Sequence, residues 1–546
     1  MNIILVGFMG TGKSSVGERL SKIIGKKYFD VDKIIEEREK RSIPEIFSEK
    51  GEDYFRRVES EVIKELAKTD ESVISTGGGA IVRKENLENL RRKGLLICLT
   101  ARPEVILKRT EKEGERPLLD AALDKRINTI EKLLEKREPF YKKADVTIDT
   151  SFLSVSQVVD EIVKILKPER LFVDLKERGY PVFIGFLLEK VGEIAKNFAS
   201  GRKVLIVSDT NVFPLYGEVT KKSLEERGFD VYCLQVPAGE KSKSLGRVRK
   251  IYDFCLSKGF DRGSSILALG GGVVGDLAGF AAATFMRGIR FYMVPTTLLS
   301  QVDSGVGGKV GVNLPQGKNL VGAFYQPKFV LIDPVLLRTL SLRRIREGLA
   351  EIIKCAIIKN GEFFSYLEDN ISKIISRDIG IIKEVIKKAV KVKMEIVEED
   401  EKEEKGLRQV LNFGHTIAHA IEKVSGYRRY THGEAVAVGM VGEAKIGREM
   451  GILPATSFER IKNLVEKAGL PLKAKGVKPE EVMDALKVDK KKREDKIFFV
   501  LPKDIGDVFL TSDVPPSIVR KVLREIIDDY TCYTWPKLKS SGRKRT

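Results

Sequence analysis

The chain has 546 residues, too many for one hydrophobic core, and this length predicts three or four domains. Its net charge of +19 comes from runs that mix both signs, such as KIIEEREKR, which favours a charged surface or anionic substrates over nucleic-acid binding. Five scattered cysteines, no signal peptide and no long uninterrupted apolar stretch predict a cytoplasmic enzyme with no membrane partner.

The first part of the chain alternates strands and helices. We expect strands at IILVG, SVISTGG, LLICLT and ADVTIDT. Helices are expected from Lys13, over residues 124–136, and at SVSQVVDEIVKILK, which Pro168 ends. This pattern predicts a parallel sheet flanked by helices in residues 1–167.

The second part opens in the same style and then changes. LFVDL, YPVFIG, KVLIVSDTN, VYCLQVP and SSILALGGG read as strands, with helices between the later ones. After about Pro334 the pattern is helical, apart from a hairpin at KIFFVLPKDIGDVFLT. We therefore predict an α/β domain over residues 168–334, a helical domain over 335–528 and a basic tail over 529–546.

A phosphate-binding loop lies at the start of the chain. GFMGTGKS fits the pattern GxxxxGK[ST], between a predicted strand and a predicted helix. Backbone amides of such a loop surround phosphate oxygens, its lysine reaches the terminal phosphates, and its serine hydroxyl meets Mg²⁺. The first domain is therefore predicted to bind a nucleotide.

FDVDKIIEE, GEDYFRRVE, STGGGA, ERPLL and KREPFY follow this loop in order, and the set resembles shikimate kinase. The resemblance implies that shikimate is held by Asp32, Arg56, Gly77, Gly78, Gly79 and Arg137. It implies that ATP is bound by Gly10, Thr11, Gly12, Lys13, Ser14, Ser15 and Arg116. Mg²⁺ would be held by Ser14 and, through water, by Asp30, and the catalytic residues would be Lys13 and Asp32.

All three histidines of the chain, His415, His419 and His432, fall within one short stretch. Histidine is a frequent metal ligand and titrates near neutral pH. His415 and His419 are four residues apart, so on a helix they would share a face. Spacing alone therefore makes them a candidate pair of ligands.

A glycine-rich turn, GGGVVGD, follows the strand SSILALG and contains GxGxxG. A standard dinucleotide site has an acid about 20 residues further on, but Thr296 and Thr297 stand there. The turn alone therefore indicates either a variant nucleotide site or a chance match.

The wider pattern is more specific. PAGEKSKSL, GGGVVGDLAGF, VPTTLLSQVDSGVGGK, GKNLVGAFYQP, GLAEIIK, NFGHTIAHA and HGEAVAVGM resemble 3-dehydroquinate synthase over nearly all of the second part. That family uses NAD and a divalent metal, usually Zn²⁺ or Co²⁺. The resemblance assigns NAD contacts to Asp209, Glu240, Lys243, Gly271, Gly272, Gly275, Asp276, Thr296, Thr297, Lys309 and Lys318.

The same resemblance separates the histidines. The metal ligands would be Glu351, His415 and His432, whereas His419 would move protons on the substrate. Glu347 lies one helical turn before Glu351, and spacing alone makes it the alternative metal ligand.

The resemblance assigns the sugar-phosphate substrate to Arg287, Asp303, Lys309, Lys354, Lys393, Arg408 and Asn412. His419, Lys309, Arg408 and Asn412 would be the catalytic residues. Lys391 is a rival for Lys393, because the acidic stretch that follows is one residue longer than usual.

The whole sequence thus resembles a fusion of two shikimate-pathway enzymes acting on small molecules. One would phosphorylate shikimate with ATP, and the other would convert 3-deoxy-D-arabino-heptulosonate 7-phosphate (DAHP) to 3-dehydroquinate and phosphate. The expected fold is a P-loop kinase domain followed by a Rossmann-like α/β domain and an all-helical metal-binding domain. A homodimer through the second part is left open. Another sugar phosphate cyclase, or a polyol dehydrogenase of the glycerol dehydrogenase type, remains an alternative for that part.

Overall fold

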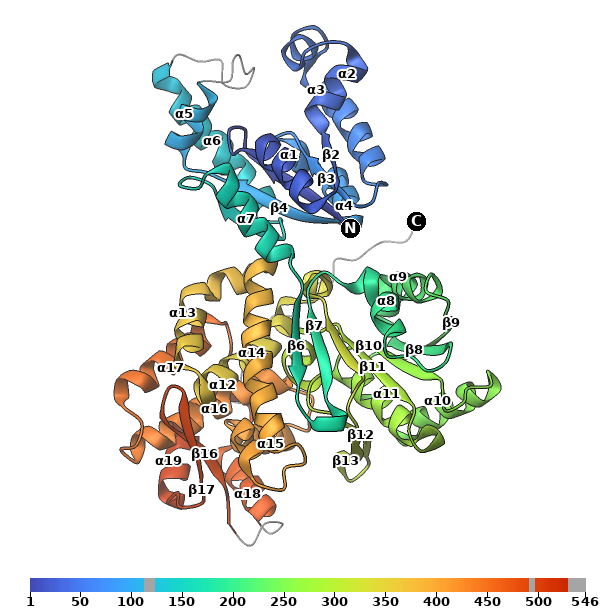
Figure 1. Cartoon of the computed structure of the whole chain (residues 1–546). Coiled ribbons are helices and arrows are strands. Elements are labelled where there is room, and N and C mark those ends of the chain that lie inside the picture. Colours follow the sequence, from blue (N-terminus) through green and yellow to red (C-terminus); the bar gives the residue numbers. More distant parts are fainter. Residues whose placement is uncertain (112–122, 491–495, 529–546) are drawn as a thin grey trace, which may run out of the picture. The chain divides into compact units, whose positions relative to one another are not determined.

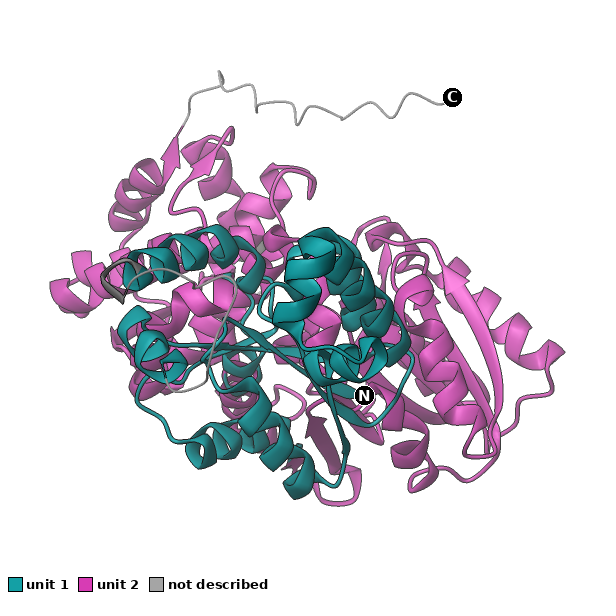
Figure 2. Ribbon diagram, turned by 90° about the horizontal axis from the view of Figure 1, so that it is seen from above, with its two compact units in different colours: residues 1–169, 376–384 teal, residues 170–375, 385–546 magenta. Residues whose placement is uncertain are grey.

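The computed structural model describes residues 1–111, 123–490 and 496–528 (Figure 1). It divides into two compact units, of which unit 1 contains residues 1–169 and 376–384 and unit 2 contains the rest (Figure 2). The boundary predicted near residue 334 lies inside unit 2 and stays a prediction. The predicted basic tail lies outside the described residues.

Unit 1 is built on a five-stranded sheet in the order β2-β3-β1-β4-β5, with every neighbouring pair parallel. The strands are β1 (Asn2–Gly7), β2 (Lys27–Asp30), β3 (Ser72–Ser75), β4 (Gly94–Thr100) and β5 (Val146–Asp149). All six residues of β1 are buried, as expected for a strand covered on both faces. The apolar run IILV is therefore a central strand of this sheet.

Seven helices of the described part of unit 1 connect and cover these strands. They are α1 (Lys13–Ile24), α2 (Val31–Glu39), α3 (Ile43–Leu66), α4 (Lys84–Lys93), α5 (Pro103–Thr110), α6 (Leu123–Tyr141) and α7 (Val155–Leu166). Ser154 and Gln157 form a capping box that starts α7. The predicted order of strands and helices is confirmed here.

Unit 2 contains a seven-stranded sheet in the order β6-β7-β14-β11-β10-β8-β9. The strands are β6 (Glu169–Val173), β7 (Tyr180–Ile184), β8 (Lys203–Asp209), β9 (Asp230–Val236), β10 (Ser265–Gly270), β11 (Arg290–Pro295) and β14 (Phe329–Ile332). The helices of this α/β part are α8 (Val191–Lys196), α9 (Phe213–Glu225), α10 (Leu245–Ser257) and α11 (Gly272–Thr284). An antiparallel hairpin of β12 (Lys309–Leu314) and β13 (Gly317–Phe324) packs against α11.

The rest of unit 2 is mainly helical, which confirms the predicted change of pattern. Its helices are α12 (Leu342–Lys359), α13 (Gly361–Ile375), α14 (Ile379–Glu399), α15 (His415–Val424), α16 (His432–Glu449), α17 (Ala455–Lys467), α18 (Pro479–Lys490) and α19 (Pro516–Ile526). The first residues of α14, up to Glu384, belong to unit 1. The part is not purely helical: β16 (Phe499–Asp504) pairs with β17 (Asp507–Thr511), and β15 (Ala474–Lys475) pairs with β18 (Ile527–Asp528). The first of these pairs is the predicted hairpin.

The order of strands and helices determines where the two glycine-rich loops lie in the fold. The loop after β1 and the turn after β10 each follow the carboxyl end of a buried parallel strand. Ligands of open α/β sheets bind at that edge, because helix N-termini and loops gather there. Among the helices that the structure describes, none has the length and apolar character needed to cross a bilayer.

Candidate functional sites

The phosphate loop of unit 1 depends on glycine at three positions. Gly7, Gly10 and Gly12 have φ angles of 136°, 74° and 92°, which side chains rarely tolerate. Lys13 is buried, and its Nζ donates to the carbonyl of Phe8 at 2.9 Å. The loop therefore turns tightly around its own lysine, at the N-terminus of α1, where an anion is favoured. The predicted ATP contacts from Gly10 to Ser15 all lie on this loop and the first turn of α1.

The two predicted Mg²⁺ contacts lie near each other. Asp30 ends β2, and its carboxylate accepts from Asp32 N at 3.1 Å and from Tyr28 Oη at 3.0 Å. The same Tyr28 hydroxyl lies 3.2 Å from the carbonyl oxygen of Ser14, whose side chain is exposed. The Tyr28 hydroxyl thus contacts both Ser14 and Asp30, so these two residues lie close enough to share one ion.

The residues predicted to hold shikimate converge at the turn after β3. A Cβ added to Gly77 would lie 2.9 Å from Asp32 Oδ1, and one added to Gly79 would lie 2.5 Å from Arg56 Nη2. A Cβ on Gly78 would lie 3.4 Å from Arg137 Nη1. The absent side chains therefore leave room for two carboxylates and two guanidinium groups. Arg137 Nη1 is buried and finds no hydrogen-bond acceptor among the described residues.

Glu59 is a buried acid that sequence reasoning missed. It is fully buried, and its Oε2 accepts from Arg56 Nη1 at 2.8 Å. Burial raises the pKa of Glu59, against the pull of Arg56. Its position three residues after Arg56 on α3 could have indicated this pair. Arg116, which is predicted to bind ATP, lies outside the described residues.

In unit 2, three helices bring Glu351, His415 and His432 together. Glu351 lies on α12, and each histidine is the first residue of its helix, α15 or α16. One ligand atom from each side chain lies within 4.8 Å of the others. Glu351 Oε1 is 3.6 Å from His415 Nε2 and 3.5 Å from His432 Nε2. The rival Glu347 instead pairs with Arg344 at 2.6 Å.

The electrostatics of this cluster favour a bound cation. Burial opposes the Glu351 anion, but Lys354 and His415 hold the pKa of this carboxyl well below its usual value. Glu351 Oε1 is buried with no hydrogen-bond donor among the described residues. Two imidazoles and one carboxylate lie close together, and one carboxylate oxygen has no hydrogen-bond partner among the described residues. Such a site can bind Zn²⁺ or Co²⁺ and leave coordination positions open for substrate.

His419 stands beside the three and not among them. Its side chain is exposed, with its ring 5.4 Å from that of His415 and 6.3 Å from that of His432. It therefore faces the same space from a more open position.

Glu422 is a second acid that sequence reasoning missed. Its Oε2 lies 3.6 Å from His432 Nδ1, and its Oε1 lies 3.7 Å from Lys318 Nζ. A carboxylate on the far nitrogen of a metal-binding imidazole orients that ring. The spacing of His415, His419 and Glu422 on α15 puts all three on one face, which could have indicated this role.

The predicted substrate cations lie in ion pairs around this cluster. Lys354 pairs with Glu351, Lys393 with Asp303 and Lys309 with Glu403. Burial opposes the Asp303 anion, but Lys393 holds its pKa below the usual value. Lys393 is buried whereas its rival Lys391 is exposed, so the structure favours Lys393.

The remaining predicted substrate residues lie in three places. Arg408 is buried, and its Nε lies 3.7 Å from Glu403 Oε1. Asn412 ends the short helix Leu407–Asn412, three residues before His415. Arg287 is exposed, at φ 66° in the turn before Gly288.

The predicted NAD residues surround the carboxyl ends of neighbouring strands. Asp209 ends β8, the glycine turn follows β10, and Thr296 follows β11. The side chain of Lys243 reaches both Asp276 and Asn319. Burial raises the pKa of Asp276 to about 6, against the pull of Lys243.

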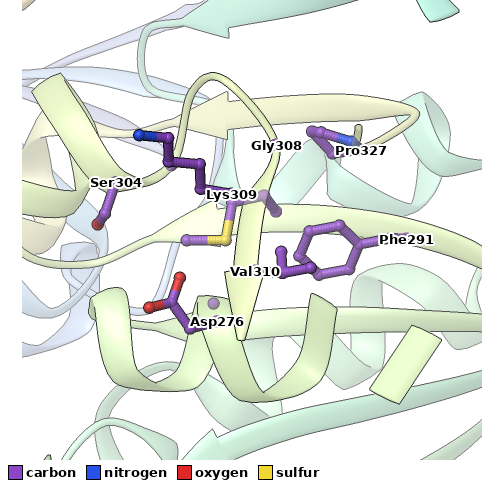
Figure 3. Close-up of a pocket in the computed structure, with 10 residues that line it drawn as sticks. Asp276, Phe291, Ser304, Gly308, Lys309, Val310 and Pro327 are labelled. Atoms are coloured by element: carbon purple, nitrogen blue, oxygen red, sulfur yellow. The ribbon is translucent and has the colours of Figure 1, made fainter. Parts of the chain in front are cut away.

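A small pocket is lined by residues of α11, β11 and β12 and of the loops beside them (Figure 3). Asp276, Ser304 and Lys309 contribute polar groups to it, beside Phe291 and Val310. Ser304 Oγ and the nearby Thr296 Oγ1 are buried without a hydrogen-bond partner among the described residues. The N-terminus of α11 has no side-chain cap. These unpaired groups suit a phosphate-bearing ligand.

The outer NAD residues are held in place by neighbours. Glu240 Oε1 accepts from Asn313 Nδ2 at 2.7 Å, and Asp209 Oδ1 accepts from Asn211 N at 2.8 Å. A Cβ on Gly271 would lie 3.1 Å from Thr297, and one on Gly272 would lie 2.9 Å from Ser304. Lys318, on β13, is exposed beside Tyr427, with its Nζ 4.3 Å from the ring centroid.

Known protein families match most of the chain. Residues 9–167 match the shikimate kinase family, and residues 233–347 and 348–492 match the N-terminal and C-terminal parts of 3-dehydroquinate synthase. The 3-dehydroquinate synthase of Caldanaerobacter subterraneus subsp. tengcongensis is 47% identical over 357 residues, which cover 65% of this chain and 100% of the relative.

Two solved structures resemble unit 2. ValA, a 2-epi-5-epi-valiolone synthase from Streptomyces hygroscopicus with NAD⁺ and Zn²⁺ bound, is 30% identical with a TM-score of 0.59, covering 64% of this chain and 96% of its own. A 2-deoxy-scyllo-inosose synthase complexed with carbaglucose-6-phosphate, NAD⁺ and Co²⁺ has the same identity and TM-score, covering 65% of this chain and 99% of its own. The two parts of the chain are thus those of a phosphotransferase and a lyase. The chain belongs to the 3-dehydroquinate synthase family and carries a shikimate kinase domain ahead of its synthase domain.

Proposed function

We propose that unit 2 converts DAHP to 3-dehydroquinate with NAD and Zn²⁺ or Co²⁺, held by the residues described above. The observation that carries this proposal is the meeting of Glu351, His415 and His432 beside buried lysines. When bound, the metal and NAD would supply polarisation of a substrate alcohol and reversible hydride transfer.

The chain's own residues have separable tasks in this reaction. Lys354, Lys393 and Arg408 would hold the anionic groups of the substrate, because buried cations attract phosphate and carboxylate strongly. His419, exposed at the edge of the cluster, would take and return protons. Lys309 and Asn412 complete the proposed catalytic set.

Unit 1 would phosphorylate shikimate with ATP and Mg²⁺. Phosphoryl transfer needs positioning and positive charge more than covalent chemistry. Lys13 would neutralise the transferred phosphate, while Ser14 and Asp30 would place the magnesium ion. Arg56 and Arg137 would pair with the carboxylate of shikimate, and Asp32 would orient its hydroxyl for attack.

The similarity values favour 3-dehydroquinate synthase over its sister cyclases. A full-length relative with that activity is 47% identical, whereas the two cyclases named above are each 30% identical. The buried cations also suit an anionic substrate better than the neutral polyol of a glycerol dehydrogenase.

Two assays on the purified full chain test the proposal. Phosphate release from DAHP should require NAD and stop when a chelator removes the metal. ADP formation from ATP should require shikimate and Mg²⁺. If neither DAHP nor shikimate is turned over, the proposed function is wrong.

We further infer that the enzyme works in the cytoplasm and does not bind nucleic acid. We also infer that a homodimer would form through unit 2. Light scattering on the purified chain measures the oligomeric state. A filter-binding assay that shows tight, salt-sensitive RNA or DNA binding would contradict the first inference.

His419→Ala should separate proton transfer from metal binding. Loss of the imidazole should reduce synthase turnover by roughly 100- to 10,000-fold, the usual range for a general acid or base. Metal content should be unchanged, because His419 stands outside the ligand cluster. His432→Ala is the matched control and should lose the metal. Loss of metal from His419→Ala would show that this histidine is a ligand.

A further inference from the structure

A buried glutamate, Glu443, lies behind the proposed metal site. It is fully buried on α16, and its Oε2 accepts from the backbone N–H of Gly414 at 2.8 Å. Gly414 is the N-cap of α15, has φ 79° and carries no side chain that could cap the helix. The first N–H groups of a helix need partners from elsewhere. Glu443 therefore supplies, from a second helix, the cap that Gly414 lacks.

The contact between the two helices is too close to allow a shift. A Cβ added to Gly439, one turn before Glu443 on α16, would lie 1.9 Å from the carbonyl oxygen of Gly414. Backbone touches backbone there, so the turn before His415 is pressed onto α16. Glu443 is thus held against that turn by packing as well as by its hydrogen bond.

A single peptide group connects Glu443 to His415. The N–H of Gly414 and the carbonyl of Phe413 belong to the same peptide group, which is trans and directs them to opposite sides. The Phe413 oxygen lies 3.2 Å from His415 Nδ1. Donation from Nδ1 to this oxygen leaves Nε2, the atom that faces Glu351, free to bind a metal.

We propose that Glu443 is a positioning residue that fixes the ring orientation and metal affinity of His415 through the Phe413–Gly414 peptide group. The proposal rests on the proposed function, because it assigns His415 to a metal. A carboxyl oxygen that accepts from the N–H makes the carbonyl of the same peptide group a better acceptor, since hydrogen bonds in series strengthen one another. That carbonyl then orients the imidazole, as a carboxylate that accepts from a metal-binding histidine does in other proteins.

The location of Glu443 supports a role beyond packing. Burial raises the pKa of this carboxyl to about 8, although the N–H groups of Gly414 and its neighbours oppose the shift. Its Oε1 has no hydrogen-bond partner among the described residues. An acid in such a place destabilises the fold unless its contacts compensate.

The test measures the dissociation constant of Zn²⁺ for the full chain by competition with a chromophoric chelator. Glu443→Met keeps the size of the side chain and removes the acceptor, so we expect affinity to fall roughly 10- to 100-fold. Glu443→Gln keeps an acceptor oxygen and should recover most of the affinity. The visible spectrum of the Co²⁺-loaded chain should change in Glu443→Met and return in Glu443→Gln.

Asp333→Leu is the matched control. Asp333 is also buried, and it accepts from the backbone N–H groups of Leu187 and Leu188 at 3.0 and 3.1 Å, away from the histidine cluster. This variant should lower the melting temperature and leave the metal affinity unchanged. If Glu443→Met behaves in the same way, Glu443 only stabilises the fold and the proposal is overturned.

Two other results are also decisive. If Glu443→Met does not fold, Glu443→Asp replaces it, because its carboxylate is one methylene short of the Gly414 amide. An unchanged Zn²⁺ affinity in Glu443→Asp overturns the proposal, and a weakened one supports it. If the unmodified chain binds neither Zn²⁺ nor Co²⁺, the proposed metal site itself fails, which separates that failure from a failure of Glu443.

Discussion

Glu351→Gln should strongly reduce the rate of the synthase reaction and leave the kinase reaction unchanged. The substitution keeps the size of the side chain but removes the negative charge that two imidazoles and Lys354 surround. A neutral amide is a poor ligand for Zn²⁺. Loss of the several kcal/mol that such an ion supplies corresponds to a rate reduction of roughly 1,000-fold. Phosphate release from DAHP and ADP formation with shikimate are measured on the same preparation, together with metal content.

Glu347→Gln is the control for this substitution. Glu347 is also buried on α12, one helical turn earlier, but it pairs with Arg344. It should keep the metal and its synthase rate. A Glu351→Gln chain that retains stoichiometric metal and normal turnover would contradict the assigned ligand set.

Lys13→Ala should impair the kinase reaction and leave the synthase reaction unchanged. Its ammonium is the positive charge at the centre of the phosphate loop, where the backbone bends around it. Removal of one charge-stabilising donor from a transition state reduces the rate by roughly 100- to 1,000-fold. Shikimate-dependent ADP formation should fall by this factor, while phosphate release from DAHP stays at the level of the unmodified chain.

Lys22→Ala tests whether any lysine of α1 would have this effect. Lys22 is exposed and pairs with Glu18 at 2.9 Å on the same helix. Its replacement should leave both rates unchanged. A similar loss of kinase activity in both lysine variants would mean that Lys13 matters for helix stability rather than for phosphate.

Much of the fold could be predicted from the sequence because its strands are buried on both faces. IILVG and SSILALG are continuous apolar runs, and each ends in glycines, a pattern that favours a parallel strand followed by a ligand-binding turn. The hairpin of β12 and β13 was not predicted. Strand β13 is largely exposed and both strands contain glycine, so the hairpin shows little hydrophobic alternation. It nevertheless carries Lys309 and Lys318.

The candidate sites could be predicted only where residues formed ordered motifs. Lys13, His415 and His432 lie in such motifs, and the structure places them at the start of helices. Glu59, Glu422 and Glu443 were missed, because a glutamate on a helix is usually a solvated surface charge. Their importance depends on which helix faces which, and helical periodicity does not contain that information.

The sequence by itself determined the two domain families, the phosphate loop, the glycine turn and the candidate ligands. Only the tertiary structure shows that Glu347 and Glu351 have different surroundings, because one helical turn on α12 separates an ion pair with Arg344 from the histidine cluster. Only the tertiary structure related Glu443 to His415, since their link passes through a peptide group where two helices touch. The physical reason is that local patterns specify helices and loops, whereas side chains from distant segments meet only when those helices pack.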